Sequence, residues 1–381
     1  MRSALLALII SVMLGQSPAA QQDEREPEEK QADRTRIVVF TPTTRGNAYW
    51  PEVYAILEAA AEDLDIELMG YEFDVGDRFA KHTEGLQILR ETRDIDGAIF
   101  SVAFGEAKPL VEEAQARGFP VMIQGPLFSE ERDELGGGPR QRYDQWIGSF
   151  AQSEEEKGYR LAKVLLETAH AAAADGTAGS PGIAVAGIGG DPTWEGSAQR
   201  EQGVRRAVRE DPEAELLQIV PTRWSQRQAQ RVASGLLGRY EDLSVIWAAS
   251  DQLAVGAATA ARRAGVELGT EMWIGGLDLS PLGLQEVENG RLTATVASPL
   301  FSYAEVLIYL YDYIHGYDFA DSMGTEFSFS VHSATESNAG EYLELYSSYE
   351  AIDFAELSKV GNPAREEYDF SLRSYRAARR D

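Results

Sequence analysis

Short apolar runs alternate with helical patterns along most of the chain, and this alternation limits the folds that the chain can adopt. The runs RIVVF (36–40) and GAIFSV (97–102) are each followed by a stretch with helical spacing of apolar residues, and the same rhythm begins again at IAVAGI (183–188). A short apolar run followed by a helix is typical of a parallel sheet whose two faces are covered by helices. Two successive sets of such units predict an α/β protein of two doubly wound, Rossmann-like lobes with a cleft between them.

The length of the chain supports two lobes, because 381 residues exceed the size of one small domain. We expect the first lobe to comprise residues 36–148 and about 299–327, since a long amphipathic helix after the last strand can return to cover it. The second lobe is then 149–298 with about 328–340, and several strands form the hinge. Residues 341–381 are charged and tyrosine-rich, and we expect them to form a C-terminal extension whose end, SLRSYRAARRD, is solvated.

The first residues have the pattern of a secretory signal peptide. They contain one arginine, an apolar run from Ala4 to Leu14, and small residues at Ser17 and Ala19, so we expect residues 1–19 to be removed by cleavage after Ala19. Residues 20–35 show no apolar periodicity and are predicted to be a disordered acidic leader. The chain has no cysteine, which excludes a lipoprotein anchor and a disulfide framework. We expect a periplasmic protein, with release into the medium as the open alternative.

The charge balance is strongly acidic. Lys and Arg number 35 against 62 Asp and Glu, and the formal net charge is −27. Such a field repels nucleic acids and anionic membranes, so neither is expected as a partner. A high-salt habitat, in which this charge is screened, and an acidic drift in a GC-rich genome are both compatible with the composition.

Motifs that carry chemistry are absent from the sequence. GIGGDPTW (187–194) follows a predicted strand but has Pro192 where a dinucleotide-binding loop needs its third glycine. There is no Gly-x-Ser-x-Gly elbow. The histidines do not form the close pairs that zinc sites use, because they are scattered over His82, His170, His315 and His332. We therefore expect no metal, no cofactor and no catalytic residues.

Polar and aromatic residues gather at the ends of predicted strands, where a cleft between two open parallel sheets would lie. Aromatic faces stack on the apolar faces of a sugar ring, and carboxylates, amides and guanidinium groups hydrogen-bond its hydroxyls. The candidate ligand-binding residues are Arg45, Asn47, Tyr49, Trp50, Gln124, Trp194, Arg200, Trp224, Ser250, Asp251, Asp278 and Ser298.

Some of these residues have a second interpretation that stays open. Tyr49 and Trp50 point in different directions, so we expect one of the two rings in the cleft. Trp194 could serve as ordinary packing. Asp251 is equally suited to cap the helix that begins near Leu253. Asp278 lies in GLDLSP, which is also good turn chemistry.

The segments around these residues resemble the type I periplasmic solute-binding proteins, the ribose- and galactose-binding-like family that shares its fold with the effector domains of lactose-repressor-like regulators. The resemblance runs from about residue 36 to 335. The most similar segments are GNAYW (46–50), SAQREQGVRRAV (197–208), SDQLAVGAATAARRAG (250–265), IGGLDLSP (274–281) and NGRLTATVAS (289–298).

The resemblance implies ligand contacts at Asn47, Tyr49, Trp50, Arg200, Trp224, Ser250 and Asp278, and Gln124 and Ser298 also fall on contact positions. Ribose binders carry Asp-Arg in place of Gln124-Gly125, Asn in place of Ser250 and Gln in place of Ser298, which argues against ribose. The Tyr-Trp pair, Gln124 and the extended tail also resemble the periplasmic autoinducer-2 receptor.

The resulting hypothesis is a monomeric, non-enzymatic periplasmic protein that closes around a small polar ligand, a sugar or a related furanose, by a hinge. It would present this ligand to the membrane permease of an ABC transporter. The alternative is a sensor that signals to a membrane histidine kinase or chemoreceptor. A transcriptional regulator is disfavoured by the signal peptide and by the lack of a basic helix-turn-helix segment.

Overall fold

The computed structural model describes residues 34–43, 49–74, 78–101, 107–125, 127, 129–174 and 182–380. The expected signal peptide and all but the last two residues of the expected leader lie outside this part of the chain. The described residues from Thr35 onward belong to one compact unit. Within the described ranges, no helix is both long enough and apolar enough to span a membrane.

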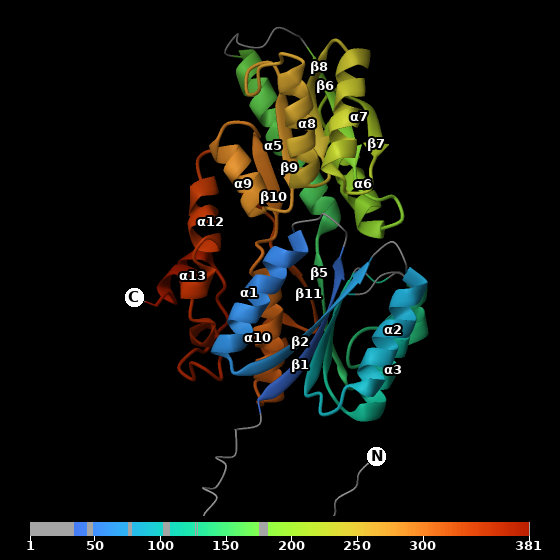
Figure 1. Ribbon diagram of the computed structural model, residues 1–381, viewed down its shortest axis with the longest axis vertical. Helices are drawn as coiled ribbons and strands as arrows, with labels where there is room; N and C mark the ends of the chain where they lie inside the picture. Colours follow the sequence, from blue (N-terminus) through green and yellow to red (C-terminus); the bar gives the residue numbers. More distant parts are fainter. Residues whose placement is uncertain are drawn as a thin grey trace, which may run out of the picture. The chain divides into compact units, whose positions relative to one another are not determined.

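The strands form two six-stranded sheets, and the helices flank them (Figure 1). The first sheet has the order β11-β5-β4-β3-β1-β2, and all its pairs are parallel. Its strands are β1 Thr35–Thr43, β2 Ile66–Asp74, β3 Gly97–Ser101, β4 Val121–Gln124, β5 Trp146–Gln152 and β11 Glu326–Phe329. The predicted α/β fold with two doubly wound lobes is confirmed.

The second sheet has the order β12-β10-β9-β8-β6-β7, in which only the β10–β12 pair is antiparallel. Its strands are β6 Ile183–Gly189, β7 Ala214–Pro221, β8 Leu243–Ala248, β9 Trp273–Leu277, β10 Ala294–Ala297 and β12 His332–Ala334. The helices are α1 Tyr49–Asp63, α2 Arg78–Glu91, α3 Ala107–Arg117, α4 Ser129–Leu135, α5 Glu154–Ala174, α6 Glu195–Arg209, α7 Gln226–Arg239, α8 Asp251–Arg263, α9 Pro281–Glu288, α10 Ser302–Ile314, α11 Ala320–Met323, α12 Ala339–Tyr346 and α13 Leu372–Ala377, with the 3-10 turns η1 Tyr349–Ala351 and η2 Phe354–Leu357.

The core follows from strand alternation. In β1, Ile37 and Val39 belong to one buried cluster, whereas Val38 and Phe40 belong to another, because successive side chains of a strand point to opposite faces. The cluster of Val38 and Phe40 includes α3, and that of Ile37 and Val39 includes α1 and α10 and continues into the second lobe. A parallel sheet covered on both faces therefore explains why RIVVF is apolar throughout.

The chain passes between the two sheets at three places within the described residues: after Gln152, after Ala297 and after Phe329. The expected first boundary, 148/149, falls inside β5, which stays paired in the first sheet up to Gln152. In the same way, β11 extends to Phe329, beyond the expected boundary at 327. The last residues of β5, β10 and β11 therefore lie next to the segments that connect the two sheets.

The C-terminal residues are packed, so the expectation of a solvated end is wrong. Tyr375 is 1% exposed, and its ring stacks on Phe301 with centroids 4.5 Å apart. Asp312 of α10 accepts hydrogen bonds from the Lys359 amide at 2.7 Å and the Tyr368 hydroxyl at 2.9 Å. The charged pattern of SLRSYRAARRD conceals this packing, because Tyr375 and Ala378 are buried while the arginines between and after them stay partly or fully exposed.

Helix α12 makes hydrogen bonds beside two of the three crossings between the sheets. The Tyr346 hydroxyl accepts a hydrogen bond from the Leu300 amide at 3.0 Å, and the Tyr342 hydroxyl lies 2.8 Å from His332 Nδ1. Leu300 belongs to the second crossing, and His332 is the first strand residue after the third. Helix α12 packs against α9, and the segment after it packs on α1 through η1 and η2 (Figure 1). The C-terminal extension therefore contacts both lobes beside the hinge.

Candidate functional site

The carboxyl ends of both sheets carry the candidate residues, as expected for parallel sheets. On the first sheet, Ser101, Gln124 and Gln152 are the last residues of β3, β4 and β5. On the second sheet, Ser250 follows β8 and Asp278 directly follows β9. The two edges are connected through the network described below.

Three aromatic rings form the apolar part of the site. Tyr49 and Trp50, at the start of α1, meet edge-on with centroids 5.2 Å apart, and Trp50 meets Tyr303 of α10 edge-on at 5.4 Å. Gln124 Nε2 donates to the Tyr303 hydroxyl at 2.5 Å, and the Ser101 hydroxyl donates to Gln124 Oε1. The amide of Gln124 therefore holds the ring of Tyr303, which in turn supports Trp50.

Tyr49 carries a polar contact as well. Its hydroxyl accepts a hydrogen bond from Gln152 Nε2 at 3.3 Å. Burial, together with the negative charge of Asp278, raises the pKa of Tyr49 far above its ordinary value. The phenol therefore stays protonated and can donate to an acceptor in the cleft.

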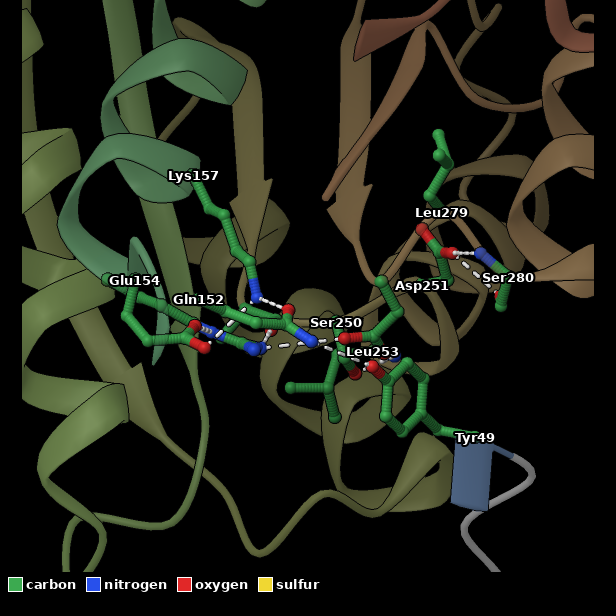
Figure 2. A network of polar contacts seen from close by, with 12 residues as sticks. Tyr49, Gln152, Glu154, Lys157, Ser250, Asp251, Leu253, Leu279 and Ser280 are labelled. Carbon is green, nitrogen blue, oxygen red and sulfur yellow. Dashed lines mark hydrogen bonds and ion pairs between the residues drawn. The ribbon is translucent and has the colours of Figure 1, made fainter. Parts of the chain in front are cut away.

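Buried charges form the polar part of the site. Glu154, the first residue of α5, accepts from Arg200 Nε at 2.5 Å and from Lys157 Nζ at 3.0 Å. Lys157 Nζ also donates to Gln152 Oε1. Figure 2 shows Glu154, Lys157 and Gln152 directed toward one another, with Tyr49 nearby. Burial raises the pKa of Glu154, but the attraction of Arg200 and Lys157 outweighs it, so the net pKa is lowered and Glu154 is ionised.

Arg200 lies against two indole rings. Its guanidinium carbon is 5.1 Å from the centroid of the Trp194 ring and 5.7 Å from that of Trp224, which is a cation–π geometry. Nη1 donates to the Ala249 carbonyl at 2.6 Å and lies 3.6 Å from Asp278 Oδ1. Gly190 leaves the space for the Trp224 ring, since a Cβ there would lie 2.1 Å from it.

Asp278 is held in an unusual backbone conformation. Its φ is 122°, a left-handed value that a non-glycine residue rarely adopts. Burial, opposed by Arg200 and reinforced by the nearby Asp251, raises the pKa of Asp278 to about 7. The carboxyl group beside Arg200 is therefore close to its titration point at neutral pH.

Asp251 and Ser250 have structural contacts. Asp251 Oδ2 accepts two hydrogen bonds from Ser280, one from the backbone amide at 2.9 Å and one from the side-chain hydroxyl at 2.7 Å. Asp251 therefore fixes the turn after β9 (Figure 2). The cap of α8 is Ser250, whose hydroxyl accepts from the Leu253 amide at 3.3 Å. The interpretation of Asp251 as a cap of its own helix is wrong because the preceding serine fills that position.

The structure brings most of the candidate residues together. Trp50, Gln124 and Tyr49 form the edge on the first lobe, and Trp194, Arg200, Trp224 and Asp278 form the edge on the second. The Ser298 hydroxyl is buried and has no hydrogen-bond partner among the described residues. Arg45 and Asn47 lie outside the described residues.

Five residues of this network were missed by sequence reasoning. Glu154, Lys157 and Tyr303 lack a distinguishing signal in the sequence. The segment EEEK at the start of α5 is typical of a solvated first turn, which conceals the buried pair of Glu154 and Lys157. Tyr303 is one of several aromatic residues on an amphipathic helix. Ser101 and Gln152 could have been found, because each lies within two residues of the end of a predicted apolar run, 97–102 for Ser101 and 146–150 for Gln152. The missed residues are Ser101, Gln152, Glu154, Lys157 and Tyr303.

The arrangement provides ring faces, amides, a guanidinium group and a carboxylate, which together suit a small polyhydroxylated molecule. The described part of the chain contains no group of three His, Cys, Asp or Glu side chains that could hold a metal ion. A separate hollow of about 670 Å³ is lined by Met272, Trp273 and Thr293, among others, at the amino ends of β9 and β10. It therefore lies at the opposite edge of the second sheet from the site.

Comparison with known proteins identifies the family. The family described as periplasmic binding protein domain matches residues 38–316. The chain belongs to this family. The predicted relation to type I periplasmic binding proteins is thereby confirmed.

Two solved structures of such binding proteins are similar to the chain. A periplasmic sugar-binding protein from Pseudomonas fluorescens is 27% identical, with a TM-score of 0.76, over 89% of this chain and 98% of that one. The periplasmic solute-binding protein of an ABC transporter from Actinobacillus succinogenes, which has bound D-allose, is 20% identical, with a TM-score of 0.67, over 81% of this chain and 100% of that one. The second likeness is one of fold.

A curated relative has a different role. The HTH-type transcriptional regulator DegA of Bacillus subtilis is 26% identical over 271 residues, which are 70% of each chain. This likeness agrees with the fold that periplasmic binding proteins share with lactose-repressor-like effector domains.

Proposed function

We propose that this periplasmic binding protein takes up a carbohydrate between its two lobes and releases it chemically unchanged. The observation that carries the proposal is the meeting of two complementary edges. Trp50 supplies an aromatic face from the first lobe, and Arg200 and Asp278 supply a donor and an acceptor from the second. The similar Pseudomonas protein is a sugar-binding protein, which supports the same ligand class here.

Each ligand-contacting residue has a role in this proposal. Trp50 stacks on the apolar face of the sugar ring, and Tyr49, which meets Trp50 edge-on, lies beside it. Arg200 and Asp278 pair with hydroxyls of the sugar, and Ser298 supplies a buried hydroxyl for another. Asn47 and Arg45, which precede α1 in the sequence, are also proposed to contact the ligand. Gln124 acts through Tyr303, and Trp194 and Trp224 act by flanking the guanidinium group of Arg200.

Hinge closure provides the mechanism. A ligand shifts the equilibrium toward the closed form only by the contacts that it makes there in addition to those in the open form. Contacts to rings of one lobe and to charged groups of the other exist together only in the closed form. The crossings after Gln152, Ala297 and Phe329 are the places where the backbone absorbs this motion.

Binding is tested by thermal denaturation with a panel of carbohydrates. The protein is unfolded and refolded to remove bound ligand and is then heated with single sugars and polyols. A ligand at about 100 times its Kd stabilises the folded form by about 2.7 kcal/mol. A saturable rise in Tm with one carbohydrate supports the proposal, and an unchanged Tm with all of them refutes it.

The proposed output is delivery of the carbohydrate to the permease of an ABC transporter, after export and removal of residues 1–19. The similar Actinobacillus protein, named as a component of an ABC transporter, supports this output. Uptake of the radiolabelled ligand by cells that lack the gene tests it. Transport predicts that uptake is lost and returns with the wild-type gene; unchanged uptake would favour the sensing alternative.

A further inference from the structure

Two buried cations at the site share one carboxylate. The side chains of Glu154, Lys157 and Arg200 are 6%, 2% and 8% exposed, and the carboxylate of Glu154 contacts both cations. A buried charge is strongly unfavourable unless it is paired and hydrogen-bonded. Glu154 therefore neutralises positive charge that an anionic ligand would otherwise find at the cleft.

Helix packing puts Glu154 in this position. Helices α5 and α6 approach closely at two glycines: a Cβ on Gly158 would lie 2.0 Å from the Arg200 carbonyl oxygen, and one on Gly203 would lie 2.1 Å from the Glu155 carbonyl oxygen. The close approach places Arg200 of α6 beside the first turn of α5, where the carboxylate of Glu154 also benefits from the helix N-terminus.

Among the described residues, the two cations of this cluster, Lys157 and Arg200, are both paired with carboxylates. Arg200 is contacted by Glu154 and Asp278, and Lys157 is contacted by Glu154. Asp251, a further acid, lies close enough to act on Asp278. The groups facing them from the other elements, Tyr49, Gln152 and the Ala249 carbonyl, are uncharged. The cluster therefore contains three acids, Glu154, Asp278 and Asp251, for two cations, and both cations are already paired, so a carboxylate on the ligand would find no unpaired cation among these described residues.

We propose that Glu154 is a specificity-determining residue that restricts the site to uncharged carbohydrates and excludes their carboxylate analogues. It acts by positioning Arg200 and by neutralising Lys157, without touching the ligand itself. This inference rests on the proposed function and adds to it the charge of the ligand and the residue that selects it.

The test compares Glu154→Gln with a matched control, Glu155→Gln. The control replaces the carboxylate of the next residue, Glu155, whose side chain is 43% exposed and pairs with Arg206 at 2.5 Å. Calorimetric titration with D-allose, D-galactose and D-glucose, and with D-galacturonate and D-glucuronate, gives the ratio of affinities for neutral and acidic sugars. The wild type is expected to bind a neutral sugar and to discriminate against the acids.

Glu154→Gln is expected to reduce this ratio by roughly tenfold or more, because one unit of charge is changed a few ångströms from the cations. Glu155→Gln is expected to keep the wild-type ratio. The double variant Glu154→Gln/Lys157→Met restores the charge balance and is expected to return the ratio toward that of the wild type, which a purely structural role of Glu154 would not do.

Three results would overturn the inference. The first is a wild type that binds the acidic sugars as well as the neutral ones. The second is a folded Glu154→Gln variant with an unchanged ratio. The third applies if Glu154→Gln does not fold, and it is a double variant that has lost the preference for neutral over acidic sugars. A double variant that keeps this preference supports the charge-balance argument. If the wild type binds none of these sugars, the carbohydrate that raises Tm in the denaturation panel and its carboxylate analogue take their place. A panel in which no carbohydrate raises Tm would instead refute the proposed function, and the inference with it.

Discussion

Glu305 provides the most quantitative test of the packing beside the hinge. This glutamate of α10 is buried, and its Oε1 accepts a hydrogen bond from the Tyr375 hydroxyl at 3.1 Å. Burial, only partly offset by this hydrogen bond, raises the pKa of Glu305 to about 8. In the unfolded chain a glutamate has a pKa of about 4.3. The folded protein therefore binds one more proton than the unfolded chain between these two values.

The sign of the pH dependence follows from this difference. Because the pKa is raised in the folded state, the contribution of Glu305 to stability is fully present below the unfolded pKa and is lost as the pH rises through about 8. Each pKa unit corresponds to about 1.4 kcal/mol, so between pH values of about 5.5 and 8.5 the wild type should lose roughly 3 kcal/mol through this group. Glu305→Gln keeps an acceptor for Tyr375 and does not titrate.

The assay is urea unfolding of the wild type and Glu305→Gln at these two pH values, followed by circular dichroism. The free energy of unfolding of the variant relative to the wild type should rise by roughly 3 kcal/mol from the lower to the higher pH. Exposed groups titrate in both proteins and cancel in this difference. Glu344→Gln, a change at an exposed ion pair with Arg379, should show no such rise. A parallel pH dependence of the wild type and Glu305→Gln would refute the conclusion that Glu305 is buried and protonated.

Three further variants test the site and the C-terminal extension. Trp50→Ala should weaken carbohydrate binding by roughly 1 to 3 kcal/mol in calorimetric titration, because a stacking face is lost; unchanged affinity in both this variant and Tyr49→Ala would rule out the stacking platform. Asp278→Asn should cost about 1.5 to 3 kcal/mol of binding free energy. Because ionised Asp278 is the better acceptor, wild-type affinity should rise as the pH increases through about 7, and the variant should lack this rise; an identical pH profile would contradict the role of Asp278. Tyr375→Ala should lower the free energy of unfolding by about 3 to 5 kcal/mol, because a buried ring is removed from its contact with Phe301; an unchanged urea midpoint would show that the extension is not part of the fold.

The fold could be predicted from the sequence because its signals are local. Each buried parallel strand is a short apolar run, as RIVVF is in β1, and each run is followed by its own helix. The candidate residues at strand ends could be found for the same reason: parallel topology places Gln124 and Asp278 at carboxyl edges without knowledge of any distant contact. The expected boundary between the lobes at 148/149 falls inside β5, although the apolar run WIGSF (146–150) continues past it.

The charged network could not be predicted because its contacts are long-range. Glu154 and Arg200 are 46 positions apart and meet only because α5 and α6 pack closely at glycines. Tyr375 pairs with Glu305 across 70 positions, and its neighbouring arginines give the tail the composition of a solvated segment. A buried charge has the same sequence signature as an exposed one until the partner that neutralises it is known.

Native mass spectrometry tests the central claim, carbohydrate binding, most directly. The exported protein is purified without dialysis, its native mass is compared with its denatured mass, and released small molecules are identified by fragmentation. The same measurement is repeated after refolding and addition of neutral sugars. The account predicts one carbohydrate per protein chain in at least one of the two experiments. A bound molecule of another chemical class, or a protein that gains no carbohydrate mass in either experiment, would contradict it.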